Sequence, residues 1–293
     1  DMMNVATFRA LTRTEVPIAL YFHENQLSYP QNTRQRHGWQ YGFVNTISAL
    51  AADTVFFSSQ YHHDVFFEYL PRMLKHFGDY NELDVIDTIR KKSSVLPLAV
   101  DLRRLDAHRI DKTPNAPPLI LWNHRWDEDK NPALFFAALD ELMATSVDFR
   151  VAIVGENPRQ RFADFETMRL RLGERLTHYG YVNSFADYAR LLWSADYVIS
   201  AAEQEFFGIA VAEAIYCGCV PILPHRLNYP NLIPADQHSI CLYPGNKLSV
   251  LLRRHLCGEF QPDVAAMRAH IARYDWSDLI DEYDNTLATL AHP

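Results

Sequence analysis

The chain has 293 residues, of which 48% are hydrophobic, and a formal net charge of −8. This size and composition supply enough apolar side chains for two modest cores rather than one. The negative charge excludes non-specific nucleic-acid binding over the whole surface, so contact with a polyanion requires a local patch.

Two further exclusions follow from the distribution of residue types. No apolar run approaches the roughly 20 residues of a membrane span, so we expect no membrane segment. The cysteines show no paired Cys-x2-Cys metal spacing, and we expect reduced core residues and a cytoplasmic location. The four are Cys217, Cys219, Cys241 and Cys257.

Short apolar segments alternate with helical spacing along the first half, which predicts a parallel sheet with crossover helices. The opening residues predict a helix that is capped by Asp1. Strands are expected at 17–22, 54–58 and 95–98, and helices at 43–52, 62–77 and 83–91.

The stretch 101–118 is charged and then rich in proline, which predicts a linker between two domains. We place the first domain at 1–112 and the second at 113–274. Strands are expected at 119–123, 149–154, 197–200 and 220–223. The amphipathic segment 275–293 is expected to form a helix that packs back on the first domain.

The segment from Glu205 to Glu213 carries two carboxylates where a predicted strand, 196–200, passes into a predicted helix, 210–217. Gly208 allows backbone N–H groups to approach a phosphate, and an acidic side chain in the first helical turn is favoured by the macrodipole, as we expect for Glu213. The arrangement predicts that Glu205 holds a sugar hydroxyl and Glu213 a ribose hydroxyl. A solvated surface position is the ordinary alternative for a single glutamate.

A pair of cations, Arg125 and Lys130, follows the predicted strand 119–123. In a loop at the carboxyl end of a parallel strand, Arg125 suits a diphosphate in fork geometry and Lys130 supplies a point charge. The alternative is a surface cluster with the acidic residues 127–129. A second candidate element is the segment 178–182, whose Tyr181 and Val182 fit either a nucleobase cradle or a core strand.

Polar residues also end the strand 17–22. His23 is placed to lie over a transferred sugar, although a structural role is the ordinary alternative for a lone histidine. The set of Glu24, Asn25 and Gln26 suits sugar or acceptor hydroxyls. The next loop mixes cations with aromatic residues, which fits an unpaired RNA base and its phosphates or simply a solvated loop. Its candidate acceptor-binding residues are Arg34, Arg36, Trp39, Gln40 and Tyr41.

Taken together, the segments 21–26, 40–42, 122–126 and 205–219 resemble the tRNA-queuosine alpha-mannosyltransferase family, a branch of the retaining glycosyltransferases of family four. The resemblance covers nearly the whole chain. It implies the α/β GT-B fold, in which two Rossmann-like domains face a central cleft. The family's glycine-rich opening loop has no counterpart here, so we expect the first domain to be incomplete at its amino end.

The resemblance implies transfer of mannose from GDP-mannose to queuosine in the anticodon loop of aspartate tRNA, with retained anomeric configuration. It implies catalytic roles for His23 and Glu205 and acceptor binding by the polar residues of the first domain. The implied donor-binding residues are Arg125, Lys130, Tyr181, Val182, Phe206, Phe207, Gly208, Ile209 and Glu213.

We expect no metal or other cofactor, because the cations and the helix amino end at Gly208 are suited to neutralise a departing diphosphate. Two alternatives stay open. One is a family-four enzyme with a lipid or polysaccharide acceptor, for which we would expect a basic amphipathic helix near the first domain. The other is a non-catalytic tRNA- or nucleotide-binding module. The oligomeric state is left open.

Overall fold

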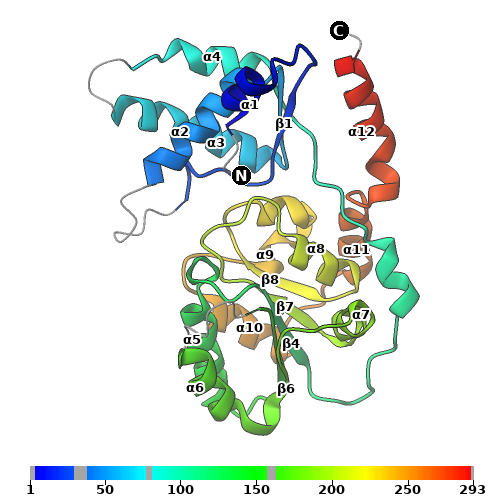
Figure 1. Cartoon of the computed structure of the whole chain (residues 1–293). Coiled ribbons are helices and arrows are strands. Elements are labelled where there is room, and N and C mark those ends of the chain that lie inside the picture. Colours follow the sequence, from blue (N-terminus) through cyan, green and yellow to red (C-terminus); the bar gives the residue numbers. More distant parts are fainter. Residues whose placement is uncertain (1–3, 30–37, 77–80, 157–162, 292–293) are drawn as a thin grey trace. The chain divides into compact units, whose positions relative to one another are not determined.

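A computed structural model describes residues 4–29, 38–76, 81–156 and 163–291 (Figure 1). The chain divides into two compact units. Unit 1 comprises Asp1–Ala99 and Asp278–Pro293, and unit 2 comprises Val100–Ser277. Within these described ranges, no helix has the length and apolar character of a membrane span.

The division between the units falls before the stretch that the sequence predicted as a linker. The 3-10 helix η1 (Arg103–His108) lies in that stretch and is attached to unit 2. The backbone N–H of Arg103 donates to Asp275 Oδ2 at 2.8 Å, and Trp193 Nε1 donates to the carbonyl of Leu105 at 2.9 Å. One buried and one half-buried hydrogen bond therefore hold η1 in unit 2, which its charged sequence does not indicate.

Unit 1 contains a parallel sheet in the order β1-β2-β3, formed by β1 (Ala19–Phe22), β2 (Thr54–Phe57) and β3 (Ser93–Val95). The predicted third strand, 95–98, is displaced toward the carboxyl end, because the real strand begins with two serines and lacks an apolar signal. The helices are α1 (Val5–Thr12), α2 (Gly38–Ala51), α3 (Gln60–His76), α4 (Asp84–Lys91) and most of α12 (Trp276–Ala291).

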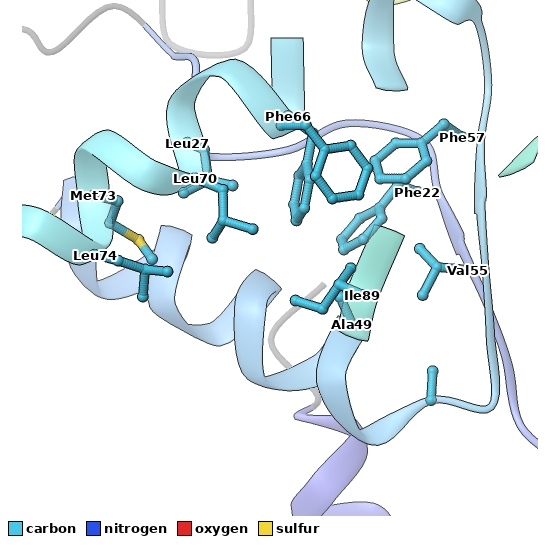
Figure 2. Packing of buried hydrophobic residues seen from close by; sticks show 12 residues of the cluster. Phe22, Leu27, Ala49, Val55, Phe57, Phe66, Leu70, Met73, Leu74 and Ile89 are labelled. Atoms are coloured by element: carbon cyan, nitrogen blue, oxygen red, sulfur yellow. The ribbon is translucent and has the colours of Figure 1, made fainter. Parts of the chain in front are cut away.

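The core of unit 1 is built from aromatic and aliphatic side chains of the strands and of the helices packed on them. Figure 2 shows Phe22, Phe57 and Phe66 gathered at its centre. The ring centroids of Phe22 and Phe57 are 5.4 Å apart, and Phe22 and Phe57 are also register partners. Because β1 and β2 end level with each other, His23 and Ser58 follow at the same edge of the sheet.

The amino-terminal helix α1 is capped differently from the expectation. Asn4 is its N-cap, and the Asn4 side chain accepts from the backbone N–H of Ala6 at 2.9 Å. The prediction of Asp1 as the cap is wrong because the helix begins at Val5, and an N-cap side chain reaches only the N–H groups two or three residues onward. Asp1 itself lies outside the described residues.

Unit 2 contains a fully parallel sheet in the order β6-β5-β4-β7-β8-β9. The strand order reverses between β4 and β7, which is the doubly wound arrangement with a topological switch point. The predicted α/β architecture is therefore confirmed. The strands are β4 (Leu119–Asn123), β5 (Arg150–Val154), β6 (Leu176–Gly180), β7 (Tyr197–Ile199), β8 (Val220–Pro224) and β9 (Leu242–Tyr243).

Helices connect and cover these strands. Helix α5 packs with α10, and α8 packs with α11 and α7. The helices are α5 (Pro132–Met143), α6 (Ala163–Leu172), α7 (Phe185–Ser194), α8 (Ile209–Tyr216), α9 (His238–Cys241), α10 (Leu248–Leu256) and α11 (Val264–Ala272).

Two local features of unit 2 bear on the sequence expectations. Every residue of β4 is buried, so the strand carries a polar residue, Asn123, into the interior at its carboxyl end. Three of the four cysteines are buried, whereas Cys257 is exposed just after α10. The expectation of a core position is wrong for Cys257, because it is the C-cap of the amphipathic helix α10 and lies in an exposed turn.

Candidate active site

The candidate site lies where β4 and β7 end, at the point where the strand order reverses. Open parallel sheets bind ligands outside the carboxyl ends of the strands at such a point. The loop after β4 and the loop after β7 are joined there. The backbone N–H of Glu203 donates to the carbonyl of Asp129 at 2.7 Å, and Asn131 Nδ2 donates to Glu203 Oε1 at 3.1 Å.

Lys130 and Glu205 meet in this pair of loops. Lys130 Nζ donates to the carbonyl of Gln204 at 2.8 Å and lies 3.4 Å from Glu205 Oε2 and 3.0 Å from Asp129 Oδ2. Only 14% of the Lys130 side chain is exposed. Burial lowers the pKa of Lys130, but the two carboxylates outweigh it and raise the pKa above its usual range. Lys130 is therefore a fixed cation beside Glu205.

The turn between β7 and α8 follows Glu205 directly. Gly208 has φ +99°, and a Cβ added there would lie 3.3 Å from Leu232 Cδ1, so the position requires glycine. Phe206 and Phe207 are 4% and 3% exposed, which leaves only their backbone groups for ligand contact. Ile209, at the start of α8, is 46% exposed.

Glu213 lies in the second turn of α8, which begins at Ile209. The expectation of a first-turn position favoured by the macrodipole is wrong, because the effect is confined to the terminal turn. A hydrogen bond holds the carboxylate instead: the Tyr188 hydroxyl donates to Glu213 Oε2 at 2.7 Å. Burial raises the pKa of Glu213 above its usual range, and this hydrogen bond partly opposes the rise.

A cavity of about 470 Å³ lies between the carboxyl ends of β4 and β5, the segment 181–183 and the first turn of α7. Tyr188 lines it, whereas Lys130, Glu205 and Glu213 are not among its lining residues. Arg125, Tyr181 and Val182 line it. The Arg125 side chain is 59% exposed and pairs with Asp127, with 3.0 Å between Arg125 Nε and Asp127 Oδ2. Tyr181 is 64% exposed. A flat exposed ring and a cation at one cavity suit a base linked to phosphate.

Gly155 allows the ends of β4 and β5 to close around this cavity. Its φ is +151°, and an added Cβ would lie 1.9 Å from the carbonyl oxygen of His124. The backbone N–H of Trp126 also donates to the carbonyl of Glu156 at 3.0 Å. A side chain at position 155 would push the two loops apart, so glycine is required here by close approach.

The sequence did not assign Asn123, His124 or Tyr188 to the site, although all three line the cavity. His124 is 5% exposed, and its Nε2 lies 3.2 Å from the carbonyl oxygen of Ile199. Burial and, to a lesser extent, the charge of Lys130 lower the pKa of His124 to about 3, so the ring is neutral. Asn123 and His124 could have been found in the sequence as two polar residues at the end of an apolar strand. No sequence feature indicates a role for Tyr188.

In unit 1 the side chains of the predicted polar residues after β1 contact residues close to them in sequence. His23 is exposed, and its ring centroid lies 4.9 Å from that of Tyr21. Asn25 is fully buried, and its Oδ1 accepts from the backbone N–H groups of Leu27 and Ser28 at 3.0 and 3.1 Å. Gln26 Nε2 donates to Glu24 Oε1 at 3.1 Å. Asn25 therefore has a clear turn-forming role.

The predicted basic and aromatic patch is described only in part. Gln40 and Tyr41 lie on α2 and are exposed. The backbone of Trp39 also belongs to α2, but its side chain lies outside the described part of the structure, as do Arg34 and Arg36. In the described ranges, no group of three or more His, Cys, Asp or Glu side chains is placed to hold a metal ion.

Comparison with solved structures places both units in a known class of fold. Sucrose-phosphate synthase from Thermosynechococcus elongatus superimposes with a TM-score of 0.69 at 18% identity, covering 97% of this chain and 70% of that one. A glycosyltransferase from Rickettsia africae gives a TM-score of 0.67 at 17% identity, covering 98% and 74%. The protein has the GT-B fold of the glycosyltransferases, as predicted.

Family models and a curated relative narrow this class. The model for the tRNA-queuosine alpha-mannosyltransferase N-terminal region matches residues 1–100, and that for glycosyl transferases group 1 matches residues 104–250. The tRNA-queuosine alpha-mannosyltransferase of Drosophila melanogaster is 37% identical over 224 residues, 74% of this chain and 59% of the relative. The chain belongs to the tRNA-queuosine alpha-mannosyltransferase family, within the group 1 glycosyltransferases.

A second curated relative shares less of the sequence. A GDP-mannose-dependent alpha-(1-6)-phosphatidylinositol dimannoside mannosyltransferase of Mycobacterium tuberculosis is 29% identical over 147 residues. That match covers 48% of this chain and 38% of the relative. The chain thus spans somewhat more than half the length of the Drosophila relative and about two fifths of the mycobacterial one.

Proposed function

We propose that the protein transfers mannose from GDP-mannose to queuosine in the anticodon loop of aspartate tRNA, with retention of the anomeric configuration. The observation that carries this proposal is the pairing of Lys130 with Glu205 at the strand switch point of a chain in this family. The name of the Drosophila relative supports the acceptor. The name of the mycobacterial relative supports GDP-mannose as the donor.

The donor is proposed to bind to unit 2. The cavity beside Arg125, Tyr181 and Val182 takes the nucleobase, and Arg125 binds the diphosphate. The backbone of the turn 206–208 and the amino end of α8 contribute N–H groups to the phosphates. Glu213 accepts from a ribose hydroxyl. We propose that no metal or cofactor is needed, because these groups and Lys130 neutralise the departing diphosphate.

Glu205 is proposed to orient the transferred sugar rather than to attack it. Lys130 holds one carboxylate oxygen of Glu205, and the backbone N–H of Phe206 donates to the other at 3.2 Å. A carboxylate fixed at both oxygens is suited to receive a sugar hydroxyl in a defined direction. Retention then follows from attack on the face that the diphosphate leaves, with a phosphate oxygen taking the acceptor proton.

Unit 1 is proposed to contribute the catalytic His23 and the acceptor-binding residues. The exposed Gln40 and Tyr41 on α2 support a contact with the tRNA, since aromatic rings stack on unpaired bases. His23→Ala is expected to lower turnover while leaving GDP affinity unchanged. Because the proposed substrate is tRNA, we also propose a cytoplasmic location for the protein.

The direct test incubates the protein with GDP-mannose and queuosine-containing tRNA and measures the nucleosides by mass spectrometry. We expect a mass gain of one hexose on queuosine. Glu205→Ala serves as the control with strongly reduced turnover. Absence of the product, in a preparation that binds GDP, would contradict the proposed acceptor and leave the donor site in place.

A lipid acceptor is the second candidate, because the mycobacterial relative is named for a phosphatidylinositol substrate. The same incubation with phosphatidylinositol mannosides in place of tRNA separates the two. Transfer to the lipid alone would favour this candidate. GDP binding without transfer to either acceptor would favour a nucleotide-binding module.

A further inference from the structure

Three polar side chains from separate elements form a chain of contacts at the cavity, from Asn123 through Tyr188 to the Glu213 carboxylate. The Tyr188 hydroxyl, on α7, donates to Glu213 Oε2, on α8, at 2.7 Å. Asn123 Nδ2, at the end of β4, lies 3.4 Å from the same hydroxyl oxygen and 2.8 Å from the carbonyl oxygen of Ala210. Tyr188 is thus held between β4 and α8. Its hydroxyl has one hydrogen to donate, and Glu213 accepts that hydrogen bond.

The orientation of the Asn123 amide is fixed by chemistry. The carbonyl of Ala210 only accepts, so the nitrogen of the amide must face it. The amide oxygen is then buried, with no hydrogen-bond partner among the described residues, and Asn123 is 4% exposed. An unpartnered buried oxygen reduces stability, and an apolar residue would avoid that cost. We therefore attribute the presence of an amide at position 123 to the hydrogen bonds that its nitrogen donates, one of which is to Tyr188.

We propose that Tyr188 is a positioning residue that fixes the Glu213 carboxylate for a hydroxyl of the bound nucleotide. Tyr188 occupies Oε2, so the ligand hydroxyl is received by Oε1. The inference rests on the ribose-binding role proposed above for Glu213. Neither the sequence motifs nor the similarity to other proteins assigned a role to Tyr188.

The positioning role of Tyr188 can be measured through the pH dependence of GDP binding, because the Tyr188 hydroxyl affects the pKa of Glu213. The titratable groups close to it are Tyr188 on α7 and Cys217 on α8, while Arg268 on α11 acts on Tyr216 and Cys217. Burial, then the charge of Glu213, raises the pKa of Tyr188 well above its usual range, so its hydroxyl stays neutral and keeps donating. Loss of that donor raises the pKa of Glu213 further, because the hydrogen bond lowers it.

The experiment is calorimetric titration of GDP at several pH values against wild type and variants. Tyr188→Phe is expected to bind GDP roughly fivefold to tenfold more weakly at neutral pH, because losing the fixed direction of the carboxylate should weaken its contact with the ligand by about one ordinary hydrogen bond. Affinity requires ionised Glu213 and falls as pH drops through its pKa. This acidic loss should therefore begin at higher pH in Tyr188→Phe. Titration of the GDP phosphate is common to all variants and cancels in the comparison.

Tyr216→Phe is the matched control. Tyr216 lies on α8 and its hydroxyl donates to the carboxylate of Asp106 at 2.8 Å, so the same bond type is lost away from the cavity. We expect less than a twofold change and no shift in the pH profile. Asn123→Leu is a second variant, expected to weaken binding about twofold to threefold by releasing Tyr188. Thermal unfolding establishes that each variant is folded.

The outcomes separate the two proposals. If Glu213→Ala weakens GDP binding but folded Tyr188→Phe matches wild type in affinity and pH profile, the positioning role is wrong and the ribose role stands. If Glu213→Ala binds GDP as wild type does, both the ribose-binding role of Glu213 and the positioning role of Tyr188 are wrong. A Tyr216→Phe shift equal to that of Tyr188→Phe would also overturn the positioning role, since the effect would then be structural.

Discussion

Polar side chains follow the carboxyl ends of both β4 and β1, but they are held in different ways. In the described sheets, β4 is an interior strand of unit 2 and β1 an edge strand of unit 1. After β4, Lys130 is held by Glu205 and by the carbonyl of Gln204, which are 75 and 74 residues away in sequence. After β1, the Asn25 side chain bonds to backbone N–H groups two and three residues onward. A site formed by distant segments depends on the whole unit, whereas a local turn depends on a few residues.

The largest expected effect breaks the distant pairing. Lys130→Met leaves Asp129 and Glu205 as half-buried carboxylates without their cation, and we expect unit 2 to lose about 3 kcal/mol of unfolding free energy. Denaturant unfolding followed by tryptophan fluorescence measures it, since Trp122, Trp126 and Trp193 lie in unit 2.

The control for this change is Arg125→Met. Arg125 is an exposed cation in the same loop, and its pair with Asp127 is worth at most about 0.5 kcal/mol. Equal losses in the two variants would show that Lys130 is no more than a surface charge. The Lys130–Glu205 pair after β4 would then contribute no more to the stability of unit 2 than an exposed ion pair does.

The second-largest expected effect is on turnover, and it distinguishes the two carboxylates Glu205 and Glu213 of unit 2. Glu205→Ala is expected to lower turnover about 100-fold with GDP affinity nearly unchanged, since the contact is proposed to act on the sugar in the transition state. Glu213→Ala is expected to weaken GDP binding instead. Calorimetry and steady-state kinetics measure the two.

Glu203→Ala is the control for Glu205→Ala. Glu203 lies two residues earlier in the same loop, and its side chain bonds to Asn131 rather than to Lys130. We expect turnover within about threefold of wild type, because only a hydrogen bond between loops is lost. A loss as large as that of Glu205→Ala would point to loop order instead of sugar orientation.

The smallest effect concerns the local turn after β1. Asn25→Ala removes the acceptor for the backbone N–H groups of Leu27 and Ser28, and we expect a loss of about 1 kcal/mol confined to this turn. Hydrogen exchange should show faster exchange at these two amides only. Gln26→Ala is the neighbouring control, as its side chain bonds to Glu24 and to no other described residue. Faster exchange throughout unit 1 would mean that the turn is not local.

The sequence drew attention to Arg125 and Glu205 because both lie in loops between a strand and a helix. Arg125 and Glu205 were located by the order of strand, loop and helix, which survives in a single sequence as hydrophobic periodicity. The positions of His124 and Tyr188 were not predicted. His124 follows an apolar strand and matters because it contacts Ile199 of another strand. Tyr188 has ordinary helical spacing, and only the packing of α7 against α8 brings it to Glu213.

The amino-acid sequence by itself determined the parallel α/β architecture, the family and the loops that carry charge, because these depend on local periodicity and on short contiguous motifs. Tertiary structure alone decided which charges meet, that the ring of His124 is neutral, and what holds Glu213. Those properties arise from burial and from contacts between segments far apart in the chain. Local sequence does not encode the distance or the solvent exclusion on which they depend.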